Sequence, residues 1–166
     1  MFLPDGRDYL CPTCKEGMLR FHDHCMRSIR HSGGGQEWIE IPRHRCSNPR
    51  CKRIHRMLPD RLLPYKQYEQ PVIRDSLDGC LDPGEAGNAP SAESIKRWGH
   101  WLMSNSLDIE GYVKSIAHRE LRFSGDLLKT GISLLEALKK KIPQSWLSTV
   151  IRIIYNAGGF LRPFYG

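Results

Sequence analysis

The first third of the chain shows the alternation of apolar and polar residues that is typical of β-strands. Residues 18–30 and 36–45 both read as extended, and the intervening Ser32-Gly33-Gly34-Gly35 is a strong turn signal. The β-forming side chains of the two segments are Leu19, Phe21, Ile29, Trp38, Ile39 and Ile41. The pattern predicts the two arms of a β-hairpin.

From residue 66 onward the apolar residues recur at helical spacing. The predicted helices cover residues 66–81, 92–104, 107–121 and 126–141, followed by a last helix that Pro143 opens and Gly158-Gly159 stops. Their apolar stripes favour a compact helical core. The apolar and aromatic residues 160–166 are expected either to pack back on that core or to form a surface for a partner.

The predicted helix over residues 92–104 has the clearest start. Residues 82–90 before it are rich in glycine, proline and small polar residues, which predicts a loop, and Ser91 is a good N-cap. Ile95, Trp98 and Leu102 lie on one stripe of this helix. The opposite face is polar and partly basic.

Charge is unevenly placed along the 166 residues. The net charge is +7, and residues 1–66 hold 13 Lys and Arg against 7 Asp and Glu, so the hairpin region carries nearly all of it. A charged fraction of 26% with 40% hydrophobic residues is that of a globular domain. The longest apolar runs are too short to cross a bilayer, so no membrane partner is expected.

Two cysteine pairs bracket the predicted hairpin, Cys11 with Cys14 and Cys46 with Cys51. Pairs that a hairpin brings together can form one tetrahedral four-sulfur site, for which Zn²⁺ is the expected metal. The hairpin holds few large apolar residues, so a bound metal ion is expected to supply much of its folding free energy. This pattern predicts a zinc ribbon.

Other uses of these cysteines stay open. An iron–sulfur cluster or disulfides are possible, but residues 1–6 contain no secretory signal, so a cytoplasmic location with reduced thiols is expected. The second pair has four intervening residues where two are usual. Five nearby residues are therefore alternative ligands: His22, His24, Cys25, His44 and His55.

Basic residues crowd around the second cysteine pair, in the manner of a surface that binds a phosphate backbone. The residues predicted to contact DNA here are Arg43, Arg45, Arg50, Lys52, Arg53 and Arg56. The first two turns of the helix at residues 92–104 carry Ser94 and Arg97, which are side chains of the kind that a recognition helix presents to base edges. With the helix before it, this segment resembles a helix-turn-helix over residues 66–104, although the connection is longer than usual. A merely solvated basic surface and two ordinary bundle helices are the simpler alternatives.

Catalytic motifs are missing from the sequence. It contains no Gly-rich phosphate loop, no Gly-x-Ser-x-Gly and no His-Glu-x-x-His. A metal-dependent nuclease would need His44 or His55 to activate water, and a closed four-sulfur site leaves no open coordination position. We therefore expect no enzymatic activity.

The chain resembles a family of small, poorly characterised bacterial proteins that join a zinc ribbon to a helix-turn-helix-like segment and look like the recognition portions of insertion-sequence transposases. The segments that carry the resemblance are Cys-Pro-Thr-Cys at 11–14, Ile-Pro-Arg-His-Arg-Cys at 41–46, and residues 53–68, 91–102 and 145–158. The resemblance implies that Cys11, Cys14, Cys46 and Cys51 bind zinc. It also implies that Ser94, Lys96, Arg97 and His100 form the outer face of a DNA-reading helix.

The sequence thus predicts an α+β protein, with a zinc ribbon and packed connector over residues 1–65 and a helical domain over residues 66–166. The expected function is binding of double-stranded DNA as an accessory or regulatory component of a mobile element. The alternative is an adaptor that holds a transposase or another large partner through the ribbon and the aromatic tail. A ribbon that acts on RNA or on the transcription machinery is a third possibility.

Overall fold

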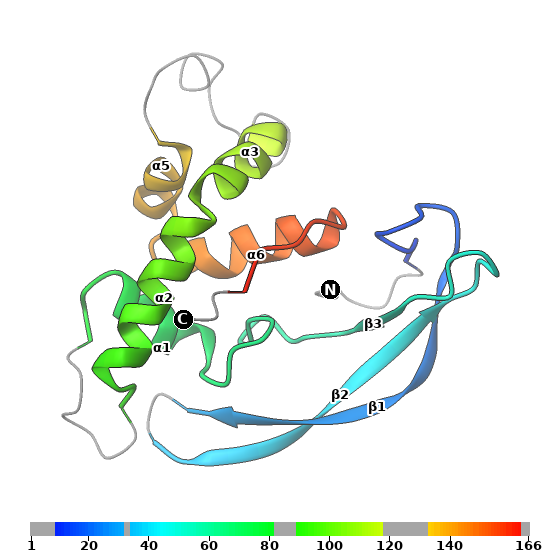
Figure 1. The fold of residues 1–166 in the computed structure, drawn as a ribbon, viewed down its shortest axis with the longest axis horizontal. Coiled ribbons are helices and arrows are strands. Elements are labelled where there is room, and N and C mark those ends of the chain that lie inside the picture. The colour runs from blue at the N-terminus through cyan, green and yellow to red at the C-terminus, as the bar shows by residue number, and fades with distance from the viewer. Residues whose placement is uncertain (1–8, 32–33, 82–88, 118–132, 164–166) are drawn as a thin grey trace.

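The computed structural model describes residues 9–31, 34–81, 89–117 and 133–163, and these form a mixed α+β fold (Figure 1). A three-stranded antiparallel sheet in the order β1-β2-β3 packs beside the helices. The strands and helices are β1 (Leu19–Arg30), β2 (Gln36–Cys46), β3 (Ile54–Arg56), α1 (Gln70–Leu77), α2 (Ala92–Ser104), α3 (Ser106–Ala117), α5 (Leu134–Lys141) and α6 (Trp146–Asn156).

The predicted hairpin is confirmed. β1 and β2 pair along their whole lengths, with Arg30 opposite Gln36 at one end and Leu19 opposite Cys46 at the other. The register shifts between Phe21 and Asp23, where a β-bulge changes the direction of the side chains that follow. Both Leu19 and Cys46 are buried at the cysteine end of the hairpin.

β3 is a strand that the sequence pattern did not predict. It pairs with the end of β2, so that Arg43 lies opposite Arg56 and Arg45 lies opposite Ile54. Three residues are too few to show a period of two, and β3 forms because the chain returns from the second cysteine pair alongside β2. The sheet therefore has a third strand, β3, which forms one of its two edges next to the predicted basic residues.

Helix α1 begins later than predicted. The expected start at residue 66 is wrong, because residues 66–69 make backbone contacts with the hairpin and the connector instead. Arg30 donates its N–H to the Gln67 carbonyl at 2.8 Å, and Glu69 donates its N–H to the Arg30 carbonyl at 3.1 Å. Pro71 then lies in the first turn of α1, where a missing N–H is tolerated.

Helix α2 has the predicted bounds. The Ser91 hydroxyl accepts a hydrogen bond from the Ser94 N–H at 3.2 Å, as an N-cap does. The predicted stripe faces the core, with Trp98 buried and Ile95 and Leu102 half-buried against it, and the buried Trp101 widens this face. Indole rings and aliphatic side chains thus share the face of α2 that contacts the core.

The structure describes only part of each of the next two predicted helices. The end of the expected helix 107–121 and the start of the expected helix 126–141 lie outside the described residues. α5 begins at Leu134 with Ser133 as its N-cap, so the predicted helix is not continuous through Ser133. Glu110 on α3 accepts hydrogen bonds from the N–H groups of Leu134 and Leu135 at 2.9 and 3.1 Å, which fixes α5 against α3.

Helix α6 closes the core. Pro143 lies in the turn before the helix rather than inside it. Gly158 has φ +87°, and the Gly159 N–H bonds to the Ile154 carbonyl at 2.8 Å, which is the geometry of a glycine C-cap. The following Leu161 is buried, so this part of the tail packs back on the helices, which was one of the two expectations for it. Residues 164–166 lie outside the described residues.

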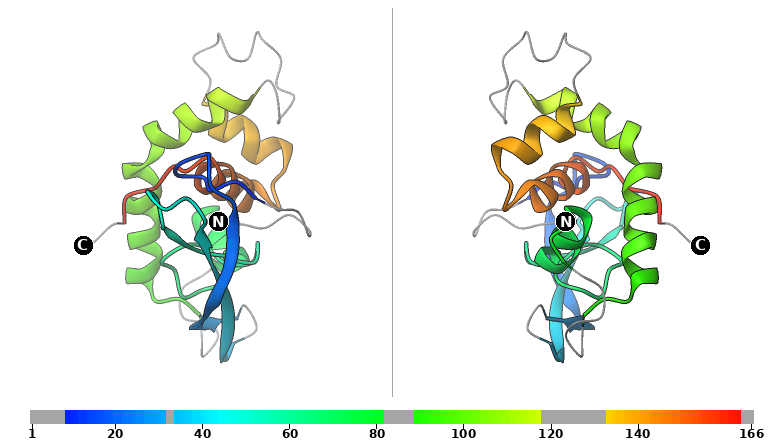
Figure 2. Two further views of the ribbon diagram at one scale, coloured as in Figure 1. Left: turned by 90° about the vertical axis from the view of Figure 1, so that its right-hand side faces the viewer. Right: turned by 90° about the vertical axis from the view of Figure 1, so that its left-hand side faces the viewer.

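One buried cluster joins the hairpin to the helices. Ile29 and Ile41 from the hairpin pack with the connector leucines Leu62 and Leu63 and with residues of every described helix, including the fully buried Trp146. Figure 1 shows the helices on one side of the curved hairpin, and the end-on views in Figure 2 show α2 (green) and α5 (orange) on opposite sides of α6. Residues on both sides of the predicted boundary at 65/66 thus contribute to the same core.

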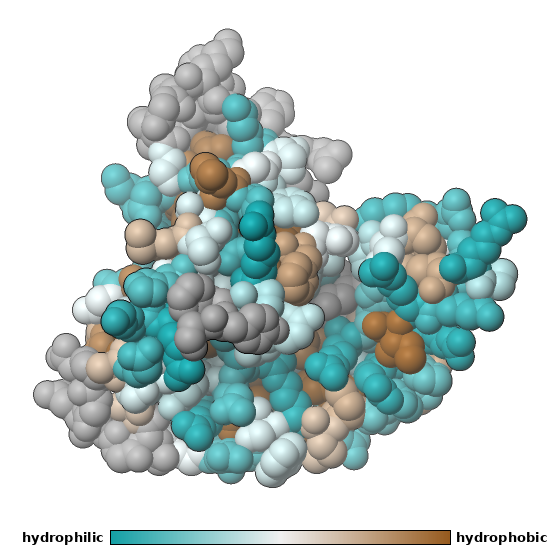
Figure 3. All heavy atoms as spheres, viewed as in Figure 1, coloured by the Kyte–Doolittle hydropathy of each residue, from teal (hydrophilic) through white to brown (hydrophobic). Residues whose placement is uncertain are grey.

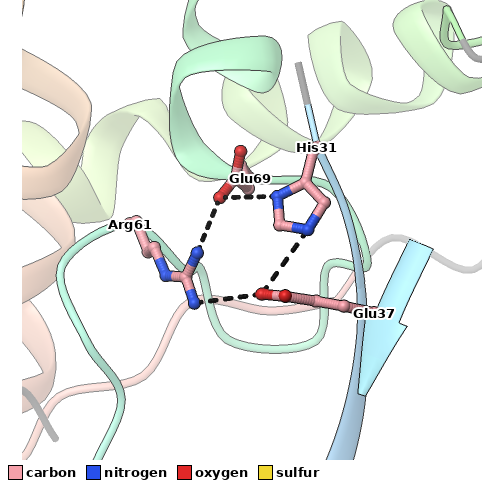
Figure 4. Close-up of polar contacts among 4 residues, drawn as sticks. All are labelled: His31, Glu37, Arg61 and Glu69. Carbon is pink, nitrogen blue, oxygen red and sulfur yellow. Dashed lines mark hydrogen bonds and ion pairs between the residues drawn. The ribbon is translucent and has the colours of Figure 1, made fainter. Parts of the chain in front are cut away.

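An ionic cluster fastens the turn end of the hairpin to α1 (Figure 4). His31 Nδ1 and Nε2 lie 3.3 and 3.4 Å from carboxylate oxygens of Glu69 and Glu37. Arg61 from the connector bridges the same two carboxylates, at 3.2 Å each. His31 directly follows β1, Glu37 belongs to β2 and Glu69 is the N-cap residue of α1, so the cluster connects the hairpin, the connector and the start of α1.

Candidate metal centre

The first cysteine pair lies in a tight turn just before β1. The Lys15 N–H donates to the Cys11 carbonyl at 2.9 Å, and Lys15 has φ +59°, a conformation that turns the chain sharply after Cys14. An isolated bridge between Leu10 and Met18 closes the turn. The two thiols therefore point to the same side of the loop.

The second cysteine pair is built in a similar way despite its longer spacing. Cys46 is the last residue of β2, and the N–H groups of Cys51 and Lys52 both donate to the Asn48 carbonyl at 3.0 Å. The Asn48 side chain accepts from the Arg50 N–H at 2.9 Å, which folds the two additional residues into a compact turn. Lys52, like Lys15, has a positive φ, of 50°.

The four sulfurs converge on one point. The Sγ atoms of Cys11, Cys14, Cys46 and Cys51 all lie within 4.8 Å of one another. Cys11 and Cys51 are 3.8 Å apart, and Cys14 and Cys46 are 3.6 Å apart. Four sulfurs bound to one zinc ion at about 2.3 Å would be separated by about 3.8 Å, so the cluster has the dimensions of a tetrahedral metal site. All six cysteines of the chain lie in the described part, and none forms a disulfide.

Backbone N–H groups are directed at two of the sulfurs. Gly17 and Asn48 donate to Cys14 Sγ and Cys46 Sγ, each at 3.4 Å. The N–H groups of Gly17 and Glu16 lower the pKa of Cys14 to about 6, because they stabilise the thiolate. Burial raises the pKa of Cys46 to about 12. Without a cation the cluster thus favours one thiolate and disfavours a second, and a bound metal ion would remove that conflict.

The alternative ligands are placed outside the four-sulfur cluster. His55 comes nearest, with its Nε2 3.3 Å from Cys11 Sγ, and burial lowers its pKa, which favours the neutral imidazole. A neutral imidazole N–H can donate to a ligating thiolate. Cys25 packs against the main core instead. His44 pairs with His55 across β2 and β3 and contacts the Phe21 ring, with a ring separation of 5.9 Å.

The site also rests on the helical part of the molecule. Lys15 Nζ donates to the Ala157 carbonyl at 3.1 Å, close to the C-terminal end of α6, where a positive charge is favourable. A Cβ atom on Gly158 would overlap the Pro12 carbonyl oxygen, so the first cysteine turn lies directly against the end of α6. Below the sulfurs, Leu19 and Met57 form a small separate core.

The predicted DNA-contacting residues fall into three groups in the structure. Arg45, Arg50, Lys52 and Arg53 are exposed around the second cysteine turn, on an arm whose surface is mostly hydrophilic in Figure 3. Arg43 forms an ion pair with Asp23. Arg56, opposite Arg43 in the sheet, lines a hollow with it.

The third group lies on α2, away from the cysteine end of the hairpin (Figure 1). Lys96, Arg97 and His100 are exposed there. Ser94 is half-buried, and its hydroxyl lies 3.1 Å from that of Ser91, so it takes part in capping the helix. The structure therefore separates the two predicted DNA-contacting regions instead of joining them in one surface.

Gly17 and Asn48 are functional positions that the spacing of the cysteines alone did not identify. A Cβ atom on Gly17 would overlap Cys46 Sγ and lie 2.7 Å from the Asn48 nitrogen. The glycine three residues after Cys14 could have identified position 17, because a turn that directs an N–H at a thiolate brings the backbone close to the sulfur and leaves no room for a side chain.

Comparison with known proteins gives one match. A family model described as a domain of unknown function (DUF6431) matches residues 11–98, which include both cysteine pairs, the sheet and the first half of α2. No curated protein and no solved structure matches the chain. In the part of the chain that the structure describes, no helix has the length and apolar character needed to cross a membrane. Since the family model covers more than half of the 166 residues, the protein belongs to the DUF6431 family.

Proposed function

We propose that the protein is a zinc-stabilised DNA-binding protein. The observation that carries this proposal is the exposed basic group formed by Arg45, Arg50, Lys52 and Arg53, which surrounds the turn that contributes Cys46 and Cys51 to the four-sulfur cluster. Exposed arginines and lysines on a rigid turn are suited to contact several phosphates at once, because little side-chain and backbone freedom remains to be lost on binding.

Zinc is the metal we propose for the cluster, because four thiolates at tetrahedral separations favour it over harder cations. A closed four-sulfur shell leaves no position for a substrate, so the metal would be structural and the protein would not cut DNA.

The Cys46→Ser and Cys51→Ser variants should each lose the zinc that the unaltered protein holds at one ion per chain. The exposed Cys80 lies outside the cluster, so Cys80→Ser is the matched control and should keep it. Full zinc retention in both cluster variants would contradict the proposed ligands.

Duplex binding is tested by its dependence on salt. Each phosphate contact contributes about 0.9 to the slope of log affinity against log salt concentration, so the Arg50→Gln/Arg53→Gln variant should lower that slope by about 2. Lys114→Gln/Lys140→Gln removes the same charge from exposed positions on α3 and α5 and is the control. Equal salt slopes for the two double variants would exclude the basic turn as the contact surface.

A second contact through α2 is part of the same proposal. Lys96 and Arg97 lie exposed in its first two turns, where a helix that enters the major groove reaches bases. Lys96→Ala/Arg97→Ala should reduce the preference for one DNA sequence over another if this helix reads bases. If only overall affinity falls, the helix contacts phosphates alone. The accessory role in a mobile element rests on the resemblance to transposase recognition segments, and a transposase would be the protein partner.

The adaptor function remains the second candidate, favoured by an exposed aromatic group. Phe160 is 49% exposed and Tyr65 is 67% exposed, and their ring centroids are 6.1 Å apart. Deleting the whole tail would also remove the buried Leu161, so Phe160→Ser is the better test. An adaptor would lose its protein partner in this variant, whereas a DNA-binding protein would keep its duplex affinity.

A further inference from the structure

A hollow of about 470 Å³ lies between the sheet and the last helix. Its walls include Arg27 from β1, Arg43 from β2, Arg56 from β3 and two tyrosines, Tyr65 from the connector and Tyr155 from α6. Its volume is in the range of about 300–1,000 Å³ that small-molecule sites occupy. Each wall comes from a different segment, so only the folded chain assembles it.

The hollow concentrates positive charge. Arg43 and Arg56 are directly opposite each other in the sheet, and both line the hollow. Arg27 faces the same hollow, and burial together with the nearby charge of Arg56 lowers its pKa. Asp23 forms an ion pair with Arg43, but no acidic residue of the described chain lines the hollow. A bound anion would reduce the repulsion between Arg27 and Arg56.

Two of the three arginines, Arg27 and Arg43, are held in place by hydrogen bonds. Arg27 Nη2 donates to the Leu63 carbonyl at 2.6 Å and also to the Lys66 carbonyl. Arg43 makes a two-point contact with the Asp23 carboxylate. Such fixed guanidinium groups lose little freedom when they bind a phosphate, and each keeps N–H donors outside these contacts, on Nη1, for a phosphate oxygen.

Tyr65 supplies a flat apolar wall. It has φ +61°, which is uncommon for a residue with a side chain and costs on the order of 1 kcal/mol or more. This conformation leaves Tyr65 67% exposed at the junction of the arginine-lined hollow and two neighbouring depressions. Aromatic rings beside basic side chains are the combination that binds unpaired nucleotides, because the ring stacks on the base while the cations bind the phosphate.

We propose that this hollow binds a phosphate joined to a nucleobase, either a free nucleotide or an unpaired nucleotide of a strand. Arg27, Arg43 and Arg56 hold the phosphate, and Tyr65 stacks on the base. The site is distinct from the exposed basic turn proposed to contact duplex DNA, since Arg50 and Arg53 do not line the hollow. Its existence does not depend on duplex binding.

The test uses the full-length zinc-loaded protein with two probes, thymidine 5′-monophosphate and a 5′-phosphorylated ten-nucleotide oligothymidylate. Arg56→Gln and Tyr65→Leu should each weaken binding about tenfold, since one charge-assisted contact or one stacked base is lost. Lys140→Gln removes an exposed charge on α5, and Phe21→Leu removes an exposed ring on β1, so these matched controls should bind as the unaltered protein does.

Either probe can support the proposal, and together they identify the source of the nucleotide. Comparable affinity for both probes or preference for the monophosphate indicates a free nucleotide, and much tighter oligothymidylate binding indicates a strand. Arg50→Gln/Arg53→Gln should leave monophosphate binding unchanged, so failure of duplex binding and failure of this site are told apart. The proposal is overturned if neither probe binds, or if both hollow variants match their controls.

A measurement on the unaltered protein guards against variants that misfold. 4-Thiothymidine 5′-monophosphate, activated by light, crosslinks to groups beside its base. The crosslink should map by mass spectrometry to the peptide that contains Tyr65 or to the one that contains Tyr155. A crosslink confined to peptides elsewhere would refute the assignment.

Discussion

Gly17 lies so close to the Cys46 sulfur that a Cβ atom at position 17 would overlap it. The backbone of the first cysteine turn thus passes directly over the second, and the Gly17 N–H donates to Cys14 Sγ from this position. The two halves of the site are fitted to each other through a residue that is not itself a ligand.

Gly17→Ala should therefore weaken zinc binding by at least about tenfold, because the added methyl group forces Cys46 away from the other sulfurs. Competition with a chromophoric chelator measures the loss. Gly111 in α3 has nothing within 4 Å of an added Cβ, so Gly111→Ala is the matched control. It should keep zinc and gain about 0.5–1 kcal/mol in free energy of unfolding, because alanine favours a helix. Equal zinc affinity in both variants would show that the turn adjusts freely.

The metal-free protein should have two very different thiols in its cluster. Cys14, with a pKa of about 6, is largely thiolate at pH 7, and Cys46, with a pKa of about 12, is almost entirely protonated. Iodoacetamide should therefore alkylate Cys14 well before Cys46, and the Cys14 rate should fall as the pH drops below about 6. Peptide mapping by mass spectrometry follows both sites.

Zinc supplies the internal comparison for that experiment. In the zinc-loaded protein both thiols should be protected, since their lone pairs are engaged by the metal. If Cys46 reacts as fast as Cys14 in the metal-free protein, the N–H groups of Gly17 and Glu16 do not control the thiolate in the way their geometry indicates.

The sequence predicted those helices and strands whose ends are determined by neighbouring residues in the chain, such as turn and capping residues. The Ser-Gly-Gly-Gly turn and the strand pattern identified the hairpin, and Ser91 identified the start of α2 because it caps that helix with its own side chain. The start of α1 was missed because Tyr68 and Glu69 are engaged by the backbone of Arg30 and Leu62, which are distant in sequence. β3 was missed for the same reason, since its partner is β2 and its own length is three residues.

The candidate metal site and the hollow differ in the same respect. The spacing of the cysteines predicted the four-sulfur site, because pairs of metal ligands that are close in the sequence form a recognisable motif. No sequence motif marks the residues of the hollow, such as Arg27, Arg56 and Tyr155. Each belongs to a different strand or helix, and they come together only when α6 packs beside the sheet. The basic composition indicated an anionic partner, but it could not tell the arginines exposed on the second cysteine turn from those that line the hollow.

Asn105 connects the tail to the helices. Its side chain is fully buried, donates to the carbonyls of Trp101 and Arg162 at 2.8 and 3.1 Å, and accepts from the Arg162 N–H at 2.8 Å. Asn105→Ala should lower the free energy of unfolding by roughly 2–4 kcal/mol, because buried backbone groups lose their partners. It should also speed chymotrypsin cleavage after Phe160.

Urea unfolding and timed proteolysis check both effects. Ser115→Ala is the control, since Ser115 is exposed and its hydroxyl bonds only locally, to the Tyr112 carbonyl at 2.7 Å. That substitution should change stability by no more than about 0.5 kcal/mol. Unchanged cleavage at Phe160 in the Asn105 variant would mean that Leu161 alone anchors the tail.

Lys66 is held over the Trp101 ring, with Nζ 4.6 Å from the ring centroid. Burial, and to a lesser degree the charge of Arg97, lowers the pKa of Lys66 from 10.5 to about 8. Below pH 8 the folded protein carries the full penalty of a charged, partly buried ammonium group. Between about pH 8 and 10.5 the unfolded chain binds a proton that the folded chain has released, so the free energy of unfolding rises with pH across this window.

Lys66→Met should stabilise the protein at pH 7, because methionine keeps the apolar contact with Trp101 without the charge. The pKa change corresponds to at most about 3.4 kcal/mol, and solvent screening and the lost cation–π contact reduce the expected gain to about 1–2 kcal/mol. Urea unfolding at pH 7 and pH 10 measures this gain in free energy of unfolding, and Lys140→Met, at an exposed position, is the control. The advantage of the Lys66 variant should shrink toward zero as the pH approaches 10.5. A gain that stays constant over that range would trace the effect to packing, whereas a loss at pH 7 would mean that the contact with Trp101 outweighs the burial of the charge.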